Sequence, residues 1–357
     1  MSLFREGGEH KIRKVGHEQY SMSIQLPPDL DGRTARACPS SDCSPAFFKL
    51  RNGTGLSGQA SAFCPYCRHE AAPNDFATKR QRAYVQEVVK REAAMAAERM
   101  IRETLGMGHS GRRRLADGLM TLDLEIKPAH HPRVWRPMEE VLKRDLVCPH
   151  CTLDHSVFGF AVWCPDCGKD IFISHVRGEI AVVETILGDV DRREKDLGPR
   201  VAAHDIGNAL EDYVSIFEAT LKIQLRRHLA ALGTSEEKVE EIFRKIGSRM
   251  QSVKQAQEII ATYCGGIMLF EASDDALARL TLLFEKRHPI THNLGVVDRK
   301  YLERVQESEN EGKDIYLTKE EVLSAGPLML AMFERLHGRL FPEAKEAKPD
   351  SSPPSAT

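Results

Sequence analysis

Apolar residues in the C-terminal half recur with the period of an α-helix. The clearest run consists of Ile206, Leu210, Val214, Phe217, Leu221 and Leu225. Steps of three and four residues place all six side chains on one helix face, which then has to be buried against other helices. Further helices are predicted after breaks at 233–235, extending to about residue 261, and at 273–275, with a final helical stretch over 319–340. The pattern therefore predicts a bundle of at least four helices over 201–342.

The N-terminal half carries shorter patterns. Short alternating stretches on both sides of Asp31-Gly32 predict small strands. Residues 77–105, rich in Ala, Glu, Arg, Lys and Met with apolar residues on one side, predict a helix. A glycine-rich, basic stretch over 106–114 predicts a linker, and 176–187 fits either a short strand or the start of a helix.

These patterns predict an α+β multidomain fold. The expected segments are a leader (1–20), a first β module (21–75), a helix with a basic linker (76–117), a second β module (118–180), a linker (181–200), an all-α domain (201–342) and a tail (343–357). The tail is rich in Pro, Ser and charge and is expected to be disordered, and the leader is expected to be flexible or loosely docked.

Composition narrows the possible partners. The chain has 357 residues, which is longer than a domain with one compact core usually is. Hydrophobic residues make up 41% of it. Its net charge is only −2, so no global positive field attracts nucleic acid or membranes. Any binding to nucleic acid must use a local patch, and the candidates are Lys79, Arg80, Arg82, Arg112, Arg113 and Arg114.

The first ten residues are polar and charged, without the apolar stretch of an export signal. Apolar runs such as 326–333 are far shorter than the roughly 20 residues that a membrane helix needs. We therefore expect a cytoplasmic protein without membrane association. In a reducing compartment, cysteines hold metal ions more often than they form disulfides.

Eight of the nine cysteines form two sets, each made of two closely spaced pairs. The sets are Cys38, Cys43, Cys64 and Cys67, and Cys148, Cys151, Cys164 and Cys167. A proline follows the first cysteine of every pair, which suits the tight turn that lets both thiolates point inward. Four thiolates satisfy tetrahedral Zn²⁺, so each set predicts one structural zinc site. Both segments resemble zinc ribbons, small β modules that fold around the metal.

Nearby histidines and disulfide bonds are the alternatives to two four-cysteine sites. His69, His150 and His155 lie close enough in sequence to replace a thiolate ligand, but four cysteines are already present in each set, which favours solvated or outer-shell histidines. A disulfide framework is the other alternative, and the missing export signal disfavours it. Completed four-thiolate sites leave no open coordination position, so no catalysis is expected from the zinc. Cys264 belongs to neither set and is expected to be a small buried residue.

The densest polar cluster of the helical half is 284–293, with Arg287, His288 and His292. A fixed guanidinium charge and imidazoles titrating near pH ~6.5 are the minimal equipment for cleaving RNA without a metal. On an ideal helix Arg287 and His292 lie roughly 140° apart. Either a kink at Pro289 or assembly between two subunits would bring them together.

The arrangement Arg287-x4-His292, with a polar residue after the arginine, resembles the signature of the HEPN superfamily, and 287–302 resembles one of its branches. The resemblance covers roughly 200–342. It implies a helical, often dimeric and metal-independent endoribonuclease that leaves a 2′,3′-cyclic phosphate. Arg287 and His292 would be catalytic, His288 the polar residue of the motif and Asn293 a supporting contact, with the motifs of two subunits forming one composite site.

The expected function is thus a cytoplasmic endoribonuclease that cuts RNA as a homodimer. Its zinc ribbons would recognise a nucleic-acid or protein trigger, and the resemblance implies antiphage defence or a toxin-like stress response. A degenerate family member is one alternative, and a metal held by His288 and His292 is another, disfavoured because no carboxylate stands at a supporting helical spacing. The rival from another class is a non-catalytic adaptor that binds a partner through its ribbons and dimerises through its helices.

Overall fold

The structure is a computed structural model, and it describes residues 4–17, 19–107, 112–117, 120–125, 134–271, 275–305 and 311–342. The expected disordered tail, 343–357, lies outside the described residues. The chain forms two compact units. The N-terminal unit consists of Met1–Val147, Cys151–Gly159 and Cys164–Gly168, and the helical unit consists of Cys148–His150, Phe160–Trp163 and Lys169–Thr357.

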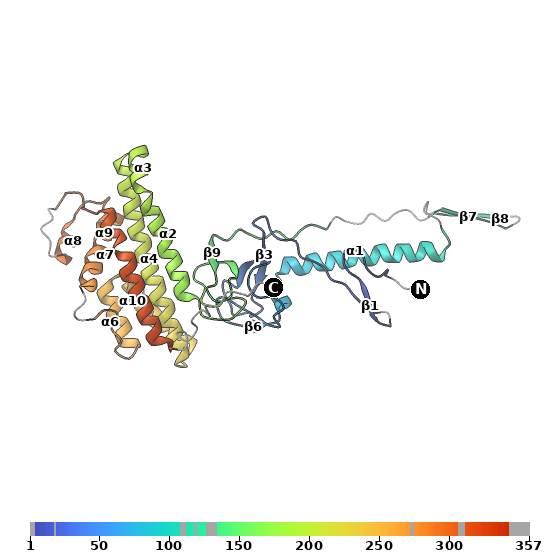
Figure 1. Cartoon of the computed structure of the whole chain (residues 1–357), viewed down its shortest axis with the longest axis horizontal. Coiled ribbons are helices and arrows are strands. Elements are labelled where there is room, and N and C mark those ends of the chain that lie inside the picture. The colour runs from blue at the N-terminus through green and yellow to red at the C-terminus, as the bar shows by residue number, and fades with distance from the viewer. Residues whose placement is uncertain are drawn as a thin grey trace, which may run out of the picture. The chain divides into compact units, whose positions relative to one another are not determined.

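The N-terminal unit is organised by one antiparallel sheet of four strands (Figure 1). Its strands are β3 (Arg33–Ala37), β4 (Phe47–Arg51), β9 (Arg144–Val147) and β10 (Asp154–Val157), in the order β3-β4-β10-β9. The hairpin β3–β4 belongs to the first cysteine segment and the hairpin β9–β10 to the second. Because β4 pairs with β10, the two expected β modules share a single sheet.

Buried ion pairs fasten this sheet. Lys49 on β4 is fully buried, and its Nζ lies 3.0 Å from Asp29 and 3.1 Å from Asp31. Arg33 on β3 reaches across the sheet to Asp154 on β10, at 2.5 Å. Buried charges are tolerated only when they are paired, so these contacts specify which strands lie side by side.

The rest of the N-terminal unit consists of a long helix and small hairpins. The helix α1 (Lys79–Thr104) starts with a reciprocal capping box between Thr78 and Gln81, and it occupies the segment predicted to be helical. The hairpins are β1 (Arg13–Gly16) with β2 (Gln19–Ser21), β5 (Ala62–Phe63) with β6 (Glu70–Ala71), and β7 (Arg112–Asp117) with β8 (Met120–Glu125). The first lies partly in the expected leader, and the last begins in the expected basic linker.

The helical unit contains nine α-helices among its described residues. They are α2 (Phe172–Gly188), α3 (Val190–Leu197), α4 (Pro199–Ala231), α5 (Glu236–Ile246), α6 (Val253–Tyr263), α7 (Ala276–His292), α8 (Arg299–Arg304), α9 (Lys319–Leu323) and α10 (Ala325–Leu340). The short 3-10 turns are η1 (Pro73–Phe76) in the N-terminal unit and η2 (Arg249–Gln251) between α5 and α6.

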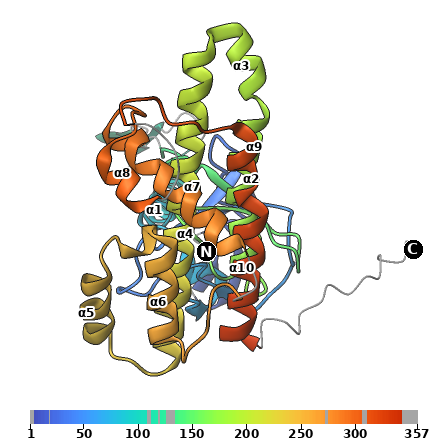
Figure 2. The ribbon, with the colours of Figure 1, turned by 90° about the vertical axis from the view of Figure 1, so that its left-hand side faces the viewer.

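The central element is α4, which packs against α2, α7 and α10 (Figures 1 and 2). Of the apolar stripe read from the sequence, Ile206 is partly buried and packs against the core, and the other members are buried in it. The stripe thus faces the core, as the helical period predicts.

The helical unit differs from the expected segments in two places. Helix α2 fills 172–188 and buries Val176, Ile180, Val183 and Leu187 in the same core as α4, so the helical unit begins well before residue 201. The single helix expected after residue 235 is interrupted at Gly247, whose φ of 53° is a conformation that glycine adopts without strain.

The molecule is thus mixed α and β, with small sheets in its N-terminal part and helices in its C-terminal part. Among the described helices, none combines the length and the apolar character needed to cross a membrane.

Candidate functional site

The first cluster of cysteines brings together Cys38, Cys43, Cys64 and Cys67, all of whose Sγ atoms lie within 4.8 Å of one another. Individual Sγ pairs are 3.7 Å apart for Cys38 and Cys67, and 3.6 Å apart for Cys43 and Cys64. A tetrahedral ion with bonds of about 2.3 Å to sulfur needs Sγ–Sγ distances of about 3.8 Å. The donor set and its size therefore fit a zinc-like metal ion.

The second cluster consists of Cys148, Cys151, Cys164 and Cys167, whose Sγ atoms meet the same limit. The Sγ atoms of Cys151 and Cys164 are 3.4 Å apart, far longer than a disulfide bond. All nine cysteines are free thiols, so the alternative of a disulfide framework is not realised. Two four-cysteine clusters that could hold metal ions are therefore present, with the same ligands that the spacing predicts.

Three of the four cysteine pairs end in the same turn. The residue after the second cysteine has a positive φ in each case: 62° at Arg68, 62° at Thr152 and 63° at Gly168. The backbone N–H groups of Tyr66 and His150 point at the sulfur of the preceding cysteine, at 3.5 and 3.4 Å. Such bonds stabilise thiolates and fix their direction, which is the behaviour of a metal-binding knuckle.

Charge also argues for a cation in these clusters. Burial raises the pKa of Cys43 to about 12; Cys67 and Cys38 add to this rise, and the hydrogen bond with Cys64 opposes it. Four thiolates so close together need a positive ion between them. Neither His69, His150 nor His155 belongs to a cluster, and Cys264 lies buried in the helical core, where burial raises its pKa to about 11.

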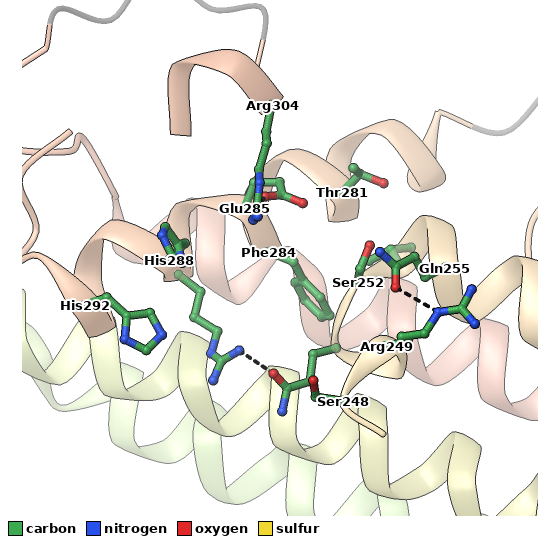
Figure 3. A pocket seen from close by; sticks show the side chains of 13 residues that line it. Ser248, Arg249, Ser252, Gln255, Thr281, Phe284, Glu285, His288, His292 and Arg304 are labelled. Atoms are coloured by element: carbon green, nitrogen blue, oxygen red, sulfur yellow. Dashed lines mark hydrogen bonds and ion pairs between the residues drawn. The ribbon is translucent and has the colours of Figure 1, made fainter. Parts of the chain in front are cut away.

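The remaining sequence candidates gather around α7. A pocket of about 280 Å³ lies beside this helix, and it is called the α7 pocket below (Figure 3). Its lining residues are Ser248, Arg249, Gln251, Ser252, Val253, Gln255, Thr281, Phe284, Glu285, Arg287, His288, His292 and Arg304. Three of the four residues expected to be catalytic, Arg287, His288 and His292, are thus brought together within one chain.

The two histidines stand on successive turns of α7, with ring centroids 5.0 Å apart (Figure 3). Burial lowers the pKa of His288 below its ordinary 6.5, and the cations Lys300 and Arg304 on α8 lower it further. Asp298 acts in the opposite direction. His288 therefore favours the neutral imidazole, which can accept a proton.

Arg287 is held on two sides. Its Nε donates to Glu211 of α4 at 2.6 Å, and its Nη1 donates to the side-chain oxygen of Gln251 at 2.8 Å. Gln251 in turn donates to Glu218 at 2.8 Å. Thr291, one turn after Arg287, also hydrogen-bonds Glu211. The guanidinium is thus part of a network that fastens α7 to α4 and to the η2 turn.

Asn293 has a different position. It follows the last residue of α7 and does not line the α7 pocket. Its side-chain amide donates to the carbonyl oxygen of Val296 at 2.7 Å, so it shapes the turn that leaves the helix. Pro289 is buried inside α7, and the helix continues past it to His292.

Several pocket residues carry no signal in the sequence. Arg249 and Arg304 lie in η2 and α8, outside the stretch 287–302. Glu211, which does not line the pocket but pairs with Arg287, follows Leu210 of the apolar stripe and looks like an ordinary flanking charge. Of the basic residues proposed to contact nucleic acid, Arg80 forms an ion pair with Glu139 at 3.6 Å and Arg82 donates to the carbonyl of Asp75. The structure describes the backbone of Arg112 and Arg113 in β7 but not their side chains.

Comparison with protein-family models gives no match to this chain, and no curated protein or solved structure matches it either. The likeness to HEPN domains therefore rests on the residues of 287–302 and on the helical surroundings alone.

Proposed function

We propose that this protein is a metal-independent endoribonuclease whose active site is the α7 pocket. The observation that carries the proposal is the convergence of Arg287, His288 and His292 in that pocket, with the two imidazole rings 5.0 Å apart. Two imidazoles supply a proton acceptor and a proton donor, and arginine side chains supply fixed positive charge for a phosphate.

In the proposed reaction, the 2′-oxygen of a ribose attacks the adjacent phosphorus while the bond from phosphorus to the 5′-oxygen breaks. His288 takes the proton of the 2′-hydroxyl, a role that fits its lowered pKa. His292, the last residue of α7, gives a proton to the leaving 5′-oxygen. The products are a 2′,3′-cyclic phosphate and a 5′-hydroxyl, and no water or metal ion is consumed.

The cysteine clusters complete the proposal as two structural zinc sites. Four thiolates in each cluster leave no open coordination position, so the zinc ions would stabilise the fold and take no part in the cleavage. The N-terminal unit is proposed to recognise the RNA or a protein trigger. A role in antiphage defence or in a toxin-like stress response follows from the HEPN resemblance alone.

The test is cleavage of end-labelled RNA by the zinc-loaded full-length protein in a buffer with a low concentration of EDTA, which leaves the structural zinc bound. We expect a 2′,3′-cyclic phosphate end, and a loss of kcat on the order of 10²- to 10⁴-fold for His288→Ala and for His292→Ala. The matched control is His204→Ala, because His204 is an exposed histidine of α4 outside the pocket.

A different result would favour the adaptor. If folded protein with two bound zinc ions cuts neither single-stranded nor structured RNA, the nuclease proposal is wrong. Equal activity of the His204 and His292 variants would also contradict it, because the pocket would then not be the active site.

A further inference from the structure

Three arginines line the α7 pocket in the described part of the chain, and their guanidinium groups have different partners. Arg287 is paired with Glu211 at 2.6 Å, and Arg304 is paired with Glu285 at 3.3 Å. A carboxylate therefore offsets the charge of each of these two arginines. Neither offers an uncompensated cation to an incoming phosphate.

Arg249 is different. Its Nε donates to the neutral amide oxygen of Gln255 at 3.3 Å, as the dashed line in Figure 3 shows. It is exposed, and the described residues provide no carboxylate within ion-pair distance of it. A guanidinium with a neutral partner keeps its full charge and its remaining N–H donors, which match the oxygens of a phosphate.

Arg249 stands on a turn that forms the wall of the pocket opposite the histidines (Figure 3). This turn, 248–252, contains η2 and joins α5 to α6. The hydroxyls of Ser248 and Ser252 line the same wall, and neither side chain caps the helix that it precedes. Gln251 of this turn is held by Arg287 and by Glu218, which fixes the turn relative to α7.

We propose that Arg249, with Ser248 and Ser252, binds a backbone phosphate of the nucleic-acid strand next to the one held at the histidines. Arg287 is then a positioning residue, which acts through Gln251 and Glu211 to hold this turn and α7 at a fixed separation. The proposal rests on the proposed function of the same pocket. It adds to that function by giving phosphate binding to Arg249 and positioning to Arg287.

The experiment measures binding separately from cleavage. A fluorescein-labelled single-stranded oligodeoxynucleotide has phosphates but no 2′-hydroxyl, so it binds without being cut, and its affinity is followed by fluorescence anisotropy at several salt concentrations. For Arg249→Gln we expect a rise in Kd on the order of tenfold at low salt. The slope of log K against log salt should also fall by about 0.7, the value for one single-strand phosphate contact.

Two other substitutions at arginines sharpen this result. Arg244→Gln removes the same charge from an exposed position at the end of α5, outside the pocket, and is expected to leave Kd and slope close to wild type. Arg249→Lys keeps the charge and is expected to keep the slope. A merely structural role of Arg249 would not give this difference between lysine and glutamine.

The positioning role of Arg287 is tested with the double variant Glu211→Gln/Arg287→Gln, which leaves the net charge unchanged. We expect it to bind the oligodeoxynucleotide like wild type, and to lower kcat for RNA while KM stays the same.

The proposal is overturned if Arg249→Gln binds like Arg244→Gln, or if the double variant loses the salt dependence. If Arg249→Gln weakens binding but the wild-type protein cuts no RNA, the phosphate site stands and the nuclease fails.

Discussion

At the scale of single residues, the surroundings of a charge decide what it can do. The sequence marks Arg287 as the phosphate-binding residue because a guanidinium next to histidines fits that chemistry. In the structure, two N–H groups of Arg287 donate to Glu211 and Gln251. Arg249, from another element, donates to the neutral Gln255, so its charge is not offset by a carboxylate there. The neighbouring positions of His288 and His292 could be predicted, because residues four apart lie side by side on a helix. The partner of each arginine could not, because it depends on which helices meet.

His288 gives a pH prediction at this scale. Its pKa is lowered by burial and by the cations Lys300 and Arg304, so a catalytic base at this position stays active below pH 6.5 and loses activity only as the pH falls through its lowered pKa. Lys300→Gln removes one of these cations. The pKa of His288 then rises, and the acidic limb of the kcat–pH profile moves to higher pH at low salt.

The control for this shift is Lys254→Gln, because Lys254 is an exposed lysine of α6 that does not line the pocket. An unchanged limb in Lys300→Gln, or an equal shift in both variants, would mean that His288 is not the group whose protonation limits the rate. A smaller shift at high salt is expected, because the interaction crosses solvent.

At the scale of elements, periodic stretches were predictable and pairings were not. The apolar period in α4 and the composition of α1 predict both helices with nearly the bounds that the structure has. The partnership of β4 with β10 has no local signal, because the register depends on residues far apart in the chain. Nor does spacing alone show that Lys49, Asp29 and Asp31 form one buried cluster.

That cluster gives the prediction at this scale. Lys49→Met leaves Asp29 and Asp31 without their buried cation, and breaking such a pair costs about 3–5 kcal/mol. In the zinc-loaded full-length protein, the urea concentration at which the N-terminal unit unfolds should fall, as followed by the release of zinc. Lys90→Met, at an exposed position of α1, should change the midpoint little.

Replacing Asp29 and Asp31 by asparagine together with Lys49→Met should recover most of the loss, because no buried charge then remains unpaired. If Lys49→Met unfolds at the same urea concentration as Lys90→Met, the buried pair does not stabilise the sheet.

At the scale of the whole molecule, the sequence indicates two cysteine modules followed by helices, and the structure shows two cysteine clusters and a helical region. The boundaries between the parts were harder to predict. Burial of α2 in the core of α4 moves the start of the helical unit, and no change of composition marks that point.

The expected homodimer with a composite site leads to a mixing experiment. Arg287, His288 and His292 line one pocket of a single chain, so each subunit should need its own intact set. We therefore expect no more RNA cleavage than that of the separate variants when Arg287→Ala and His292→Ala, both with impaired activity, are mixed, unfolded and refolded together. Restored cleavage would show that one subunit lends its arginine to the histidine of another.

The shared sheet also bears on how the protein is made. Leu50 on β4 pairs with His155 on β10, about a hundred residues later in the chain. A ribosome delivers β3, β4 and all four cysteines of the first cluster long before it delivers the strand that β4 needs beside it. The nascent N-terminal half must therefore keep an open sheet edge until translation has passed the second cysteine segment. A chain that terminates after α1 would leave that edge exposed permanently, and such a truncated product should be prone to aggregate.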